Sequence, residues 1–119
     1  MPYFVVTRER GPNWDWSRPM RRQDGWDAHA AFMDALAAEG FIAAGGPLGG
    51  EDDARRVLHI VVAHDAGEIE RRLADDPWTP NALLRTLAIE PWTVLLGGFG
   101  APDDAAPGCF GNERSDLAT

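Results

Sequence analysis

The chain has 119 residues, a formal net charge of −8, and 45% hydrophobic and 25% charged residues, which together indicate one globular domain. All 11 basic residues are arginines and none forms a basic run, which argues against nucleic acid or an anionic membrane as a partner. The single cysteine, Cys109, excludes an internal disulfide, and no apolar run reaches the ~18 residues of a membrane span, so we expect a soluble cytoplasmic protein.

The chain begins with a predicted strand, which is followed by a long connection. Residues 3–7 are β-branched and aromatic, as is typical of strands. The connection, residues 8–25, carries Trp14 and Trp16 together with four arginines that follow Glu9. Connections longer than ~12 residues within compact domains are often functional. We therefore interpret this segment as a candidate lid or binding loop.

The first predicted helix covers residues 26–40 and carries a histidine on its apolar face. Asp24 is the predicted N-cap, and Gly40 ends the helix. The apolar positions recur at helical spacing: Trp26, Ala30, Met33, Leu36 and Ala37. His29 falls inside this stripe, three residues after the tryptophan and four before the methionine. We expect it to face the interior of the domain.

The remaining elements complete a ferredoxin-like order. Residues 41–50 predict a strand that runs into a glycine-rich turn, and residues 55–63 predict its hairpin partner. A second helix covers residues 65–76 and begins with a D-x-x-E capping pattern formed by Asp65 and Glu68. It stops there because the next residue, a proline, disfavours helical geometry at the position before it. Residues 85–96 predict the last strand. The order is β-α-β-β-α-β, an α+β fold of the ferredoxin-like type.

The predicted domain covers residues 1–96, and residues 97–119 form a Gly-, Ala- and Asp-rich tail that we expect to be disordered alone. Right-handed crossovers place both helices on one face of the sheet, yet the last two strands carry apolar residues on both faces. A second copy covering the open face, as in a dimeric α/β barrel, is the favoured explanation. The alternative is that the long loop or the tail folds back, the tail through Phe99 or Phe110.

His29 and Asp76 are the pair that the sequence favours for chemistry. Both helices lie on one face of the predicted sheet, so the end of the second helix can approach the first. An aspartate beside an imidazole fixes its tautomer and makes it a better base, and an imidazole changes charge near neutral pH. The sequence leaves one alternative open, in which His29 is a core residue satisfied by a backbone carbonyl and Asp76 faces water. We assign the solvent-facing position to Asp75.

The other polar residues predict no metal site, no cofactor and no covalent catalysis. His59 and His64 lie five apart, on a strand and just past it, so they face opposite sides and cannot chelate one metal ion. Residues 45–50, GGPLGG, lack the spacing of a phosphate-binding loop, and Pro47 has no N–H to donate, so we predict a turn. Cys109 lies in the tail, outside any predicted site.

Four tryptophans and one arginine are the predicted substrate contacts. Trp14 and Trp16 either close over the cleft and stack on an aromatic ligand or pin the long loop to the core. Trp26 and Trp78 are the other two tryptophans that we expect to line the cleft. Arg8, at the end of the first strand, is a candidate contact for an anionic group, with a solvated arginine as the alternative.

Several short motifs, in this order and spacing, resemble the YCII-related (YciI-like) family over about residues 3–96. The motifs are the His29 segment with Gly40 eleven residues later, Gly46-Pro47, Asp76-Pro77-Trp78 and Pro91-Trp92. The resemblance implies a ferredoxin-like fold in a dimeric α/β barrel and a site built from a His–Asp pair, which by motif position is His29 and Asp76. Some relatives resemble enzymes that remove chloride from chlorinated hydroxyhydroquinones without a cofactor.

These inferences leave two hypotheses for the function. In the first, the protein is a cofactor-independent enzyme acting on a small aromatic or enolisable compound, with His29 as base or acid and Asp76 as its orienting partner. In the second, it is a homodimer that binds a small ligand or a partner without turnover. His29 is then a hydrogen-bonding residue of the pocket wall.

Overall fold

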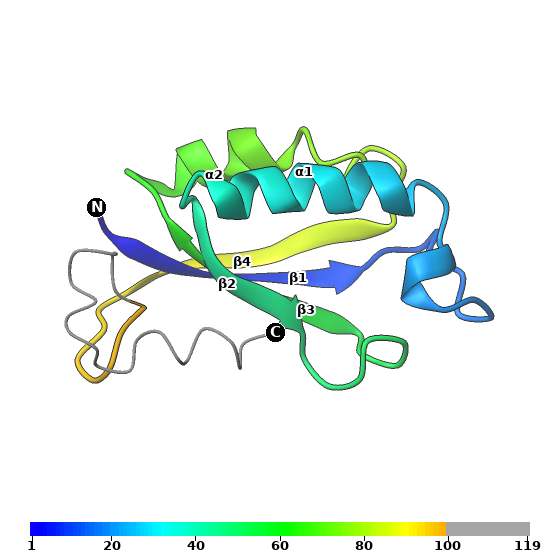
Figure 1. Cartoon of the computed structure of the whole chain (residues 1–119), viewed down its shortest axis with the longest axis horizontal. Coiled ribbons are helices and arrows are strands. Elements are labelled where there is room, and N and C mark those ends of the chain that lie inside the picture. The colour runs from blue at the N-terminus through cyan, green and yellow to red at the C-terminus, as the bar shows by residue number, and fades with distance from the viewer. Residues whose placement is uncertain (100–119) are drawn as a thin grey trace.

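The computed structural model describes residues 1–99, which form a four-stranded antiparallel sheet with two helices on one face (Figure 1). The elements are β1 (Tyr3–Arg10), the 3-10 helix η1 (Met20–Arg22), α1 (Trp26–Ala38), β2 (Ile42–Pro47), β3 (Arg56–Val62), α2 (Ala66–Leu73) and β4 (Leu84–Trp92). The strand order is β2-β3-β1-β4. This α+β arrangement fits the predicted ferredoxin-like order, whose crossovers place both helices on one side.

The central strand, β1, alternates strictly between the two faces of the sheet. Its positions beneath the helices are all buried: Phe4, Val6, Arg8 and Arg10. The β3 residues that pair with the first three share this face: Val57, His59 and Val61. Two arginines and a histidine therefore lie among apolar side chains inside the domain. Such groups need partners, because burying an unpaired polar or charged group is costly.

The N-cap of α1 is Gly25, so the prediction of Asp24 as the cap is wrong. Gly25 has a φ of 75°, in the left-handed region that glycine adopts without strain. The carbonyl of Asp24 instead accepts a 2.7 Å hydrogen bond from Trp78 Nε1. The entry into α1 is thus set by a contact with a distant segment rather than by a local side-chain cap.

The start of α2 is capped as the sequence predicts. The Asp65 carboxylate accepts a 2.8 Å hydrogen bond from the N–H of Glu68, whose own carboxylate accepts one of 2.8 Å from the N–H of His64. The helix ends at Leu73, and a turn then leads to Asp76. No helix within residues 1–99 has the length and apolar composition needed to cross a membrane.

Three strand ends differ from the prediction by more than one residue, because pairing across the sheet decides where a strand ends. β1 continues to Arg10, beyond the predicted end at residue 7, since it stays paired with β4 along this length. β2 includes residues 45–47, which pair with β3 instead of forming the predicted turn. β4 ends at Trp92 rather than at residue 96, and the next two leucines, Leu95 and Leu96, are exposed.

The buried apolar side chains form two clusters. The larger one packs the helices onto the sheet and consists of Phe4, Val6, Leu36, Phe41, Ile42, Val61, Ala63, Ile69 and Leu73. The second cluster consists of Trp14, Met20, Val57, Trp78, Leu83 and Leu84. It joins the long connection after β1 to the turn after α2. The connection is therefore part of the core at Trp14 and Met20.

The face of the sheet away from the helices is partly covered by the chain itself. After β4 the chain turns so that the Phe99 ring lies 5.7 Å from the Tyr3 ring and 6.2 Å from the Trp92 ring, measured between centroids. Other apolar side chains of this face stay half-buried: Val5, Leu58 and Val62. The remainder of the predicted tail, including Phe110 and Cys109, lies outside the described residues.

Candidate active site

Asp76 lies at the centre of a buried hydrogen-bond network in which three segments meet. Its carboxylate has no exposed surface. Oδ2 accepts a 2.8 Å hydrogen bond from Arg8 Nη1 of β1. Oδ1 accepts one of 2.9 Å from the N–H of Trp78 and one of 2.8 Å from Nδ1 of His29, on α1. These donors replace the water that the carboxylate loses on burial.

Arg8 supports Asp76 from the sheet side and does not reach the pocket. The residue is fully buried, and its Nη2 donates a 2.8 Å hydrogen bond to Thr79 Oγ1. The Thr79 hydroxyl in turn donates to the carbonyl of Leu73, at 2.8 Å. Arg10, two residues further along β1, lines the pocket instead. Arg8 therefore positions the carboxylate, and Arg10 is the arginine that a ligand can meet.

Opposing effects determine the charge of Asp76. Burial by itself raises the pKa of the carboxyl group. The hydrogen bond and charge of His29, followed by the hydrogen bonds from Arg8 and from the N–H of Trp78, outweigh burial and hold the pKa below its ordinary value. Asp76 is therefore a carboxylate at neutral pH.

His29 is held in one orientation from two directions. Its ring stacks on the Trp78 indole with centroids 3.8 Å apart and planes within 8°, and the Trp26 ring lies 5.8 Å away. In the neutral imidazole, Nδ1–H donates to Asp76, which leaves the lone pair on Nε2. No protein hydrogen bond to Nε2 occurs within residues 1–99, and His29 lines the pocket. Nε2 is therefore available to exchange a proton with a ligand.

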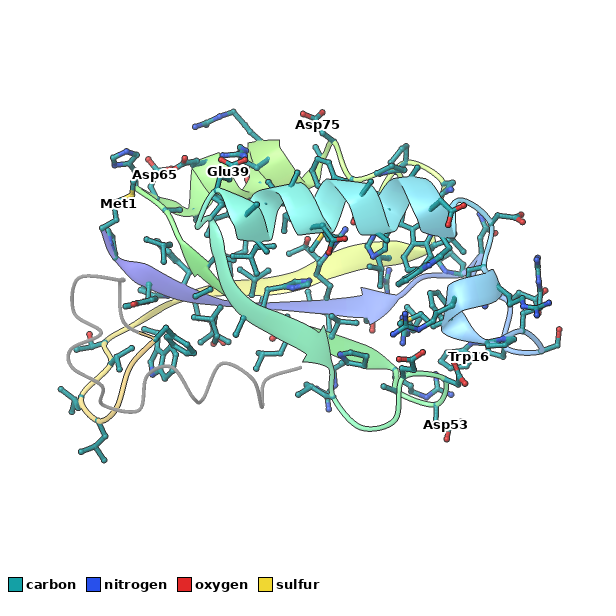
Figure 2. All side chains as sticks on the ribbon, in the orientation of Figure 1. Met1, Trp16, Glu39, Asp53, Asp65 and Asp75 are labelled. Atoms are coloured by element: carbon teal, nitrogen blue, oxygen red, sulfur yellow. The ribbon has the colours of Figure 1, made fainter. Side chains whose placement is uncertain are left out.

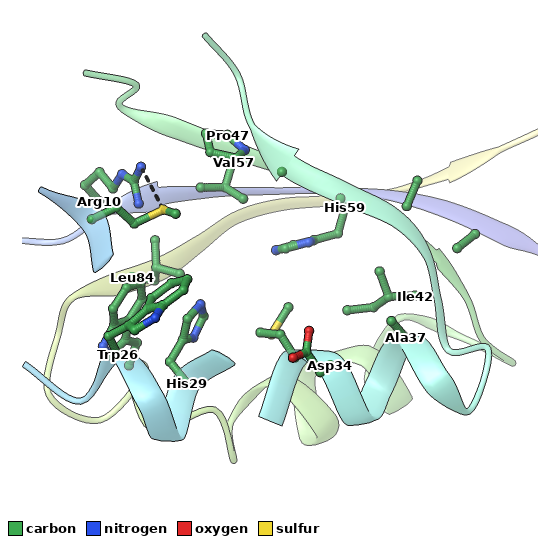
Figure 3. Close-up of a pocket in the computed structure, with 17 residues that line it drawn as sticks. Arg10, Trp26, His29, Asp34, Ala37, Ile42, Pro47, Val57, His59 and Leu84 are labelled. Atoms are coloured by element: carbon green, nitrogen blue, oxygen red, sulfur yellow. Dashed lines mark hydrogen bonds between the residues drawn. The ribbon is translucent and has the colours of Figure 1, made fainter. Parts of the chain in front are cut away.

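A pocket of about 280 Å³ lies between α1 and the β2–β3 side of the sheet (Figure 3). Most of its lining is apolar, and four lining residues are ionisable: Arg10, His29, Asp34 and His59. Within residues 1–99, no three His, Cys, Asp or Glu side chains are grouped so that they could hold a metal ion. Since a cavity of ~150 Å³ accommodates benzene, this pocket has room for one substituted aromatic ring.

The structure separates the four predicted tryptophans. Trp26 and Trp78 line the pocket, whereas Trp14 and Trp16 do not. Trp14 packs edge-on against Trp78 at 5.3 Å, and the Arg10 guanidinium lies 3.8 Å from the centre of the Trp14 ring. Trp14 therefore pins the long connection to the core, which was one of the two alternatives that the sequence left open for this residue. Trp16 is 48% exposed and lies beside η1 (Figure 2).

His59 lines the pocket, although the sequence analysis did not predict it as a site residue. It is 5% exposed, and neither ring nitrogen has a hydrogen-bond partner in the part of the chain that the structure describes. Burial, followed by the charges of Arg8 and His29, lowers the pKa of His59 to about 4, although Asp76 acts in the opposite direction. A histidine between valines on the helix-facing side of β3 was the available signal.

Comparisons with known proteins connect this geometry to a family. Residues 1–93 match the YCII-related domain, which confirms the predicted resemblance. No curated protein matches the chain. A solved structure of 5-chloro-2-hydroxyhydroquinone dehydrochlorinase (TftG) from Burkholderia phenoliruptrix AC1100, in complex with 2,5-dihydroxybenzoquinone, is similar with 28% identity and a TM-score of 0.58. The similarity covers 76% of this chain and 93% of that one.

Replacing Asp76 by asparagine should strongly destabilise the domain. Asp76→Asn leaves the fully buried Arg8 guanidinium without its countercharge, and breaking a buried ion pair in this way costs about 3–5 kcal/mol. Urea unfolding at neutral pH measures the change. The neighbouring Asp75, which is exposed and points away from the sheet (Figure 2), provides the control Asp75→Asn, expected within about 0.5 kcal/mol of the native chain.

The double variant Arg8→Met, Asp76→Asn tests the reason for that loss. Removing both charges leaves no buried unpaired ion, so the double variant should be more stable than the sum of the two single changes predicts, by about 1–3 kcal/mol. If the two single changes in the free energy of unfolding simply add in the double variant, the ion pair is not the contribution of Asp76 to stability.

His59 should make the domain less stable as the pH falls. Its pKa is lowered from 6.5 to about 4, so between these values the unfolded chain binds a proton that the folded chain rejects, and the free energy of unfolding decreases with decreasing pH. This group alone should remove about 2 kcal/mol between about pH 7.5 and about pH 5. Urea unfolding at both pH values should show a correspondingly smaller decrease in His59→Leu. The exposed His64 provides the control His64→Leu, and an undiminished decrease in His59→Leu would contradict the prediction.

Proposed function

Because the chain belongs to the YCII-related family, we propose that it is a cofactor-independent enzyme in which His29 exchanges a proton with a small aromatic substrate. The observation that carries the proposal is the 2.8 Å hydrogen bond from His29 Nδ1 to Asp76 Oδ1 at the wall of the pocket. Asp76 holds the ring in the tautomer whose Nε2 accepts a proton, and it stabilises the imidazolium that forms. A base positioned in this way contributes roughly 10²–10⁴ in rate.

Arg10 supports the same proposal with a fixed positive charge beside the site. Its Nη2 donates a 2.8 Å hydrogen bond to the carbonyl of Glu51, and its Nε donates one of 3.0 Å to the carbonyl of Ala54. The guanidinium also lies 3.8 Å from the centre of the Trp14 ring, and its Nη2 lies 3.9 Å from Met20 Sδ. A cation held in place stabilises the phenolate that forms when a base removes a hydroxyl proton, because it needs no reorganisation during the reaction.

The solved relative supports a substrate class. Its name and bound ligand are a chlorohydroxyhydroquinone dehydrochlorinase and a dihydroxybenzoquinone, so the proposed substrate is a chlorinated, polyhydroxylated benzene ring. Loss of HCl from such a ring needs no external oxidant. Chloride leaves with the electron pair of the C–Cl bond and the ring becomes a quinone. Of the two hydroxyl protons lost, one returns to the carbon that carried chlorine, and His29 takes part in moving them.

The test of this function is chloride release from 5-chloro-2-hydroxyhydroquinone. We expect the purified native chain to release chloride faster than buffer, and His29→Ala to be about 10²–10⁴-fold slower. His29→Ala leaves the Arg8–Asp76 ion pair in place, so circular dichroism and thermal unfolding should still report a folded domain. His64→Ala, which changes an exposed histidine, is the matched control.

Two outcomes would count against the proposed enzymatic function. Equal rates in the native chain and in His29→Ala would remove the base from the mechanism. Binding of the aromatic compound by the native chain without release of chloride would favour a non-catalytic ligand-binding protein. His29 would then serve as a hydrogen-bonding residue of the pocket wall.

The open face of the sheet supports a further part of the proposal, that two copies pack these faces together as a homodimer. Val5 of β1 and Leu58 and Val62 of β3 are apolar side chains on this face that stay half-buried within one copy. Phe99 covers the region next to Tyr3 and Trp92, so the dimer would use the remaining part of the face. Pairing two such surfaces removes apolar area from water.

Sedimentation equilibrium tests the dimer. Val5 lies on the open face of the central strand, and Val5→Glu should raise the dimer dissociation constant at least about tenfold, because a carboxylate would be buried without a partner. Ala31→Glu adds the same charge at an exposed position of α1 and should leave the dissociation constant unchanged. A native chain that sediments as a monomer at micromolar concentration would contradict the proposal.

A further inference from the structure

His59 has a position inside the domain that packing alone does not explain. The ring is 5% exposed, and both of its nitrogens are buried without a hydrogen-bond partner in the described part of the chain. Leaving a buried polar group unsatisfied costs free energy, whereas an apolar side chain of similar size would not carry this cost. A histidine that serves only to fill the core therefore makes the domain less stable than a leucine would.

The backbone around His59 provides the space that the ring needs. His59 pairs with Gly45 of β2, and a Cβ atom built on Gly45 would lie 2.6 Å from His59 Nδ1. That distance is too short for any side chain, so the ring occupies the volume left free by the glycine. Figure 3 shows the ring extending from β3 into the space between the sheet and α1, on the wall opposite His29.

The surroundings of His59 keep its ring uncharged. Arg8 on β1, His29 on α1 and the carboxylate of Asp76 are the charged or ionisable groups that act on it most strongly. Burial lowers the pKa of His59 to about 4, so the ring is neutral at physiological pH. A neutral imidazole offers one N–H donor and one acceptor nitrogen, which matches a hydroxyl or carbonyl oxygen rather than a carboxylate or a phosphate.

We propose that His59 is a specificity residue, which hydrogen-bonds an oxygen substituent of the ligand on the sheet wall while His29 meets a second oxygen on the helix wall. The preferred ligand is then an aromatic ring with two oxygen substituents, such as a hydroquinone, rather than a monophenol. This inference rests on the proposed function for the class of ligand and adds to it the residue that distinguishes members of that class. One of the two unsatisfied nitrogens of His59 gains a partner when the ligand binds.

Titration calorimetry with hydroquinone and phenol tests the proposal without requiring turnover. For the native chain at neutral pH we expect hydroquinone to bind about tenfold more tightly than phenol, as one additional buried hydrogen bond implies. In His59→Leu the two dissociation constants should agree within about twofold, while the melting temperature at neutral pH should not decrease. The exposed His64 again provides the matched control. His64→Leu should keep the native ratio of the two dissociation constants.

A second variant separates a lost hydrogen bond from altered packing. His59→Gln places an amide near the position of Nε2 and should recover part of the preference for hydroquinone. Recovery supports a hydrogen bond to the ligand, and a preference that stays absent assigns the effect of the leucine to packing.

Besides a preference that His59→Gln fails to restore, three results would overturn the inference. They are a native chain that binds neither compound, a native chain that binds both equally, or a preference that persists in His59→Leu. The first two need no variant, so they decide the question even if His59→Leu does not fold. The outcome is also distinguishable from that of the proposed function. A native chain that prefers hydroquinone but releases no chloride would contradict the enzyme only, whereas chloride release with equal binding would contradict the role of His59 only.

Discussion

The contact on which the site depends is the buried ion pair between Asp76 and Arg8. A carboxylate with no exposed surface remains charged only where donors replace its lost water, and this one has a guanidinium, a backbone N–H and an imidazole. The three donors come from β1, from the turn after α2 and from α1. The ion pair thus joins three elements, and it fixes the orientation of His29 as a consequence of holding them together.

The polar groups beneath the helices fall into two kinds. Arg8 and Asp76 are paired with each other, with Thr79 and with the backbone, although Arg8 Nε has no partner within the described residues. Both nitrogens of His59 are buried without a partner within residues 1–99, and the only side-chain hydrogen bond of His29 there is made by Nδ1. Both residues line the pocket. The buried nitrogens of His59 carry a cost in stability, which a ligand that hydrogen-bonds to the ring would offset. The distinction separates residues that build the site from residues that would use it.

Much of the fold was predictable because it depends on local patterns. Alternation of β-branched residues and the helical spacing of apolar ones identified the strands and helices in their observed order, and the Asp65–Glu68 pattern identified the start of α2. The errors occurred where distant segments decide the outcome. Residues 45–47 joined β2 because β3 supplies their backbone partners, and Gly25 replaced Asp24 as a cap because Trp78 engages the carbonyl of Asp24.

The sequence by itself determined the family, the order of elements and the two residues, His29 and Asp76, that the structure places 2.8 Å apart. It did so because short motifs and periodicity are properties of neighbouring residues. Only the tertiary structure decided which arginine faces the pocket, which tryptophans line it, and that His59 belongs there. Strand residues alternate between faces, and strand register, with the packing of the long connection, determines what each side chain meets. Strand register and this packing depend on contacts between segments far apart in the chain, which composition and spacing do not encode.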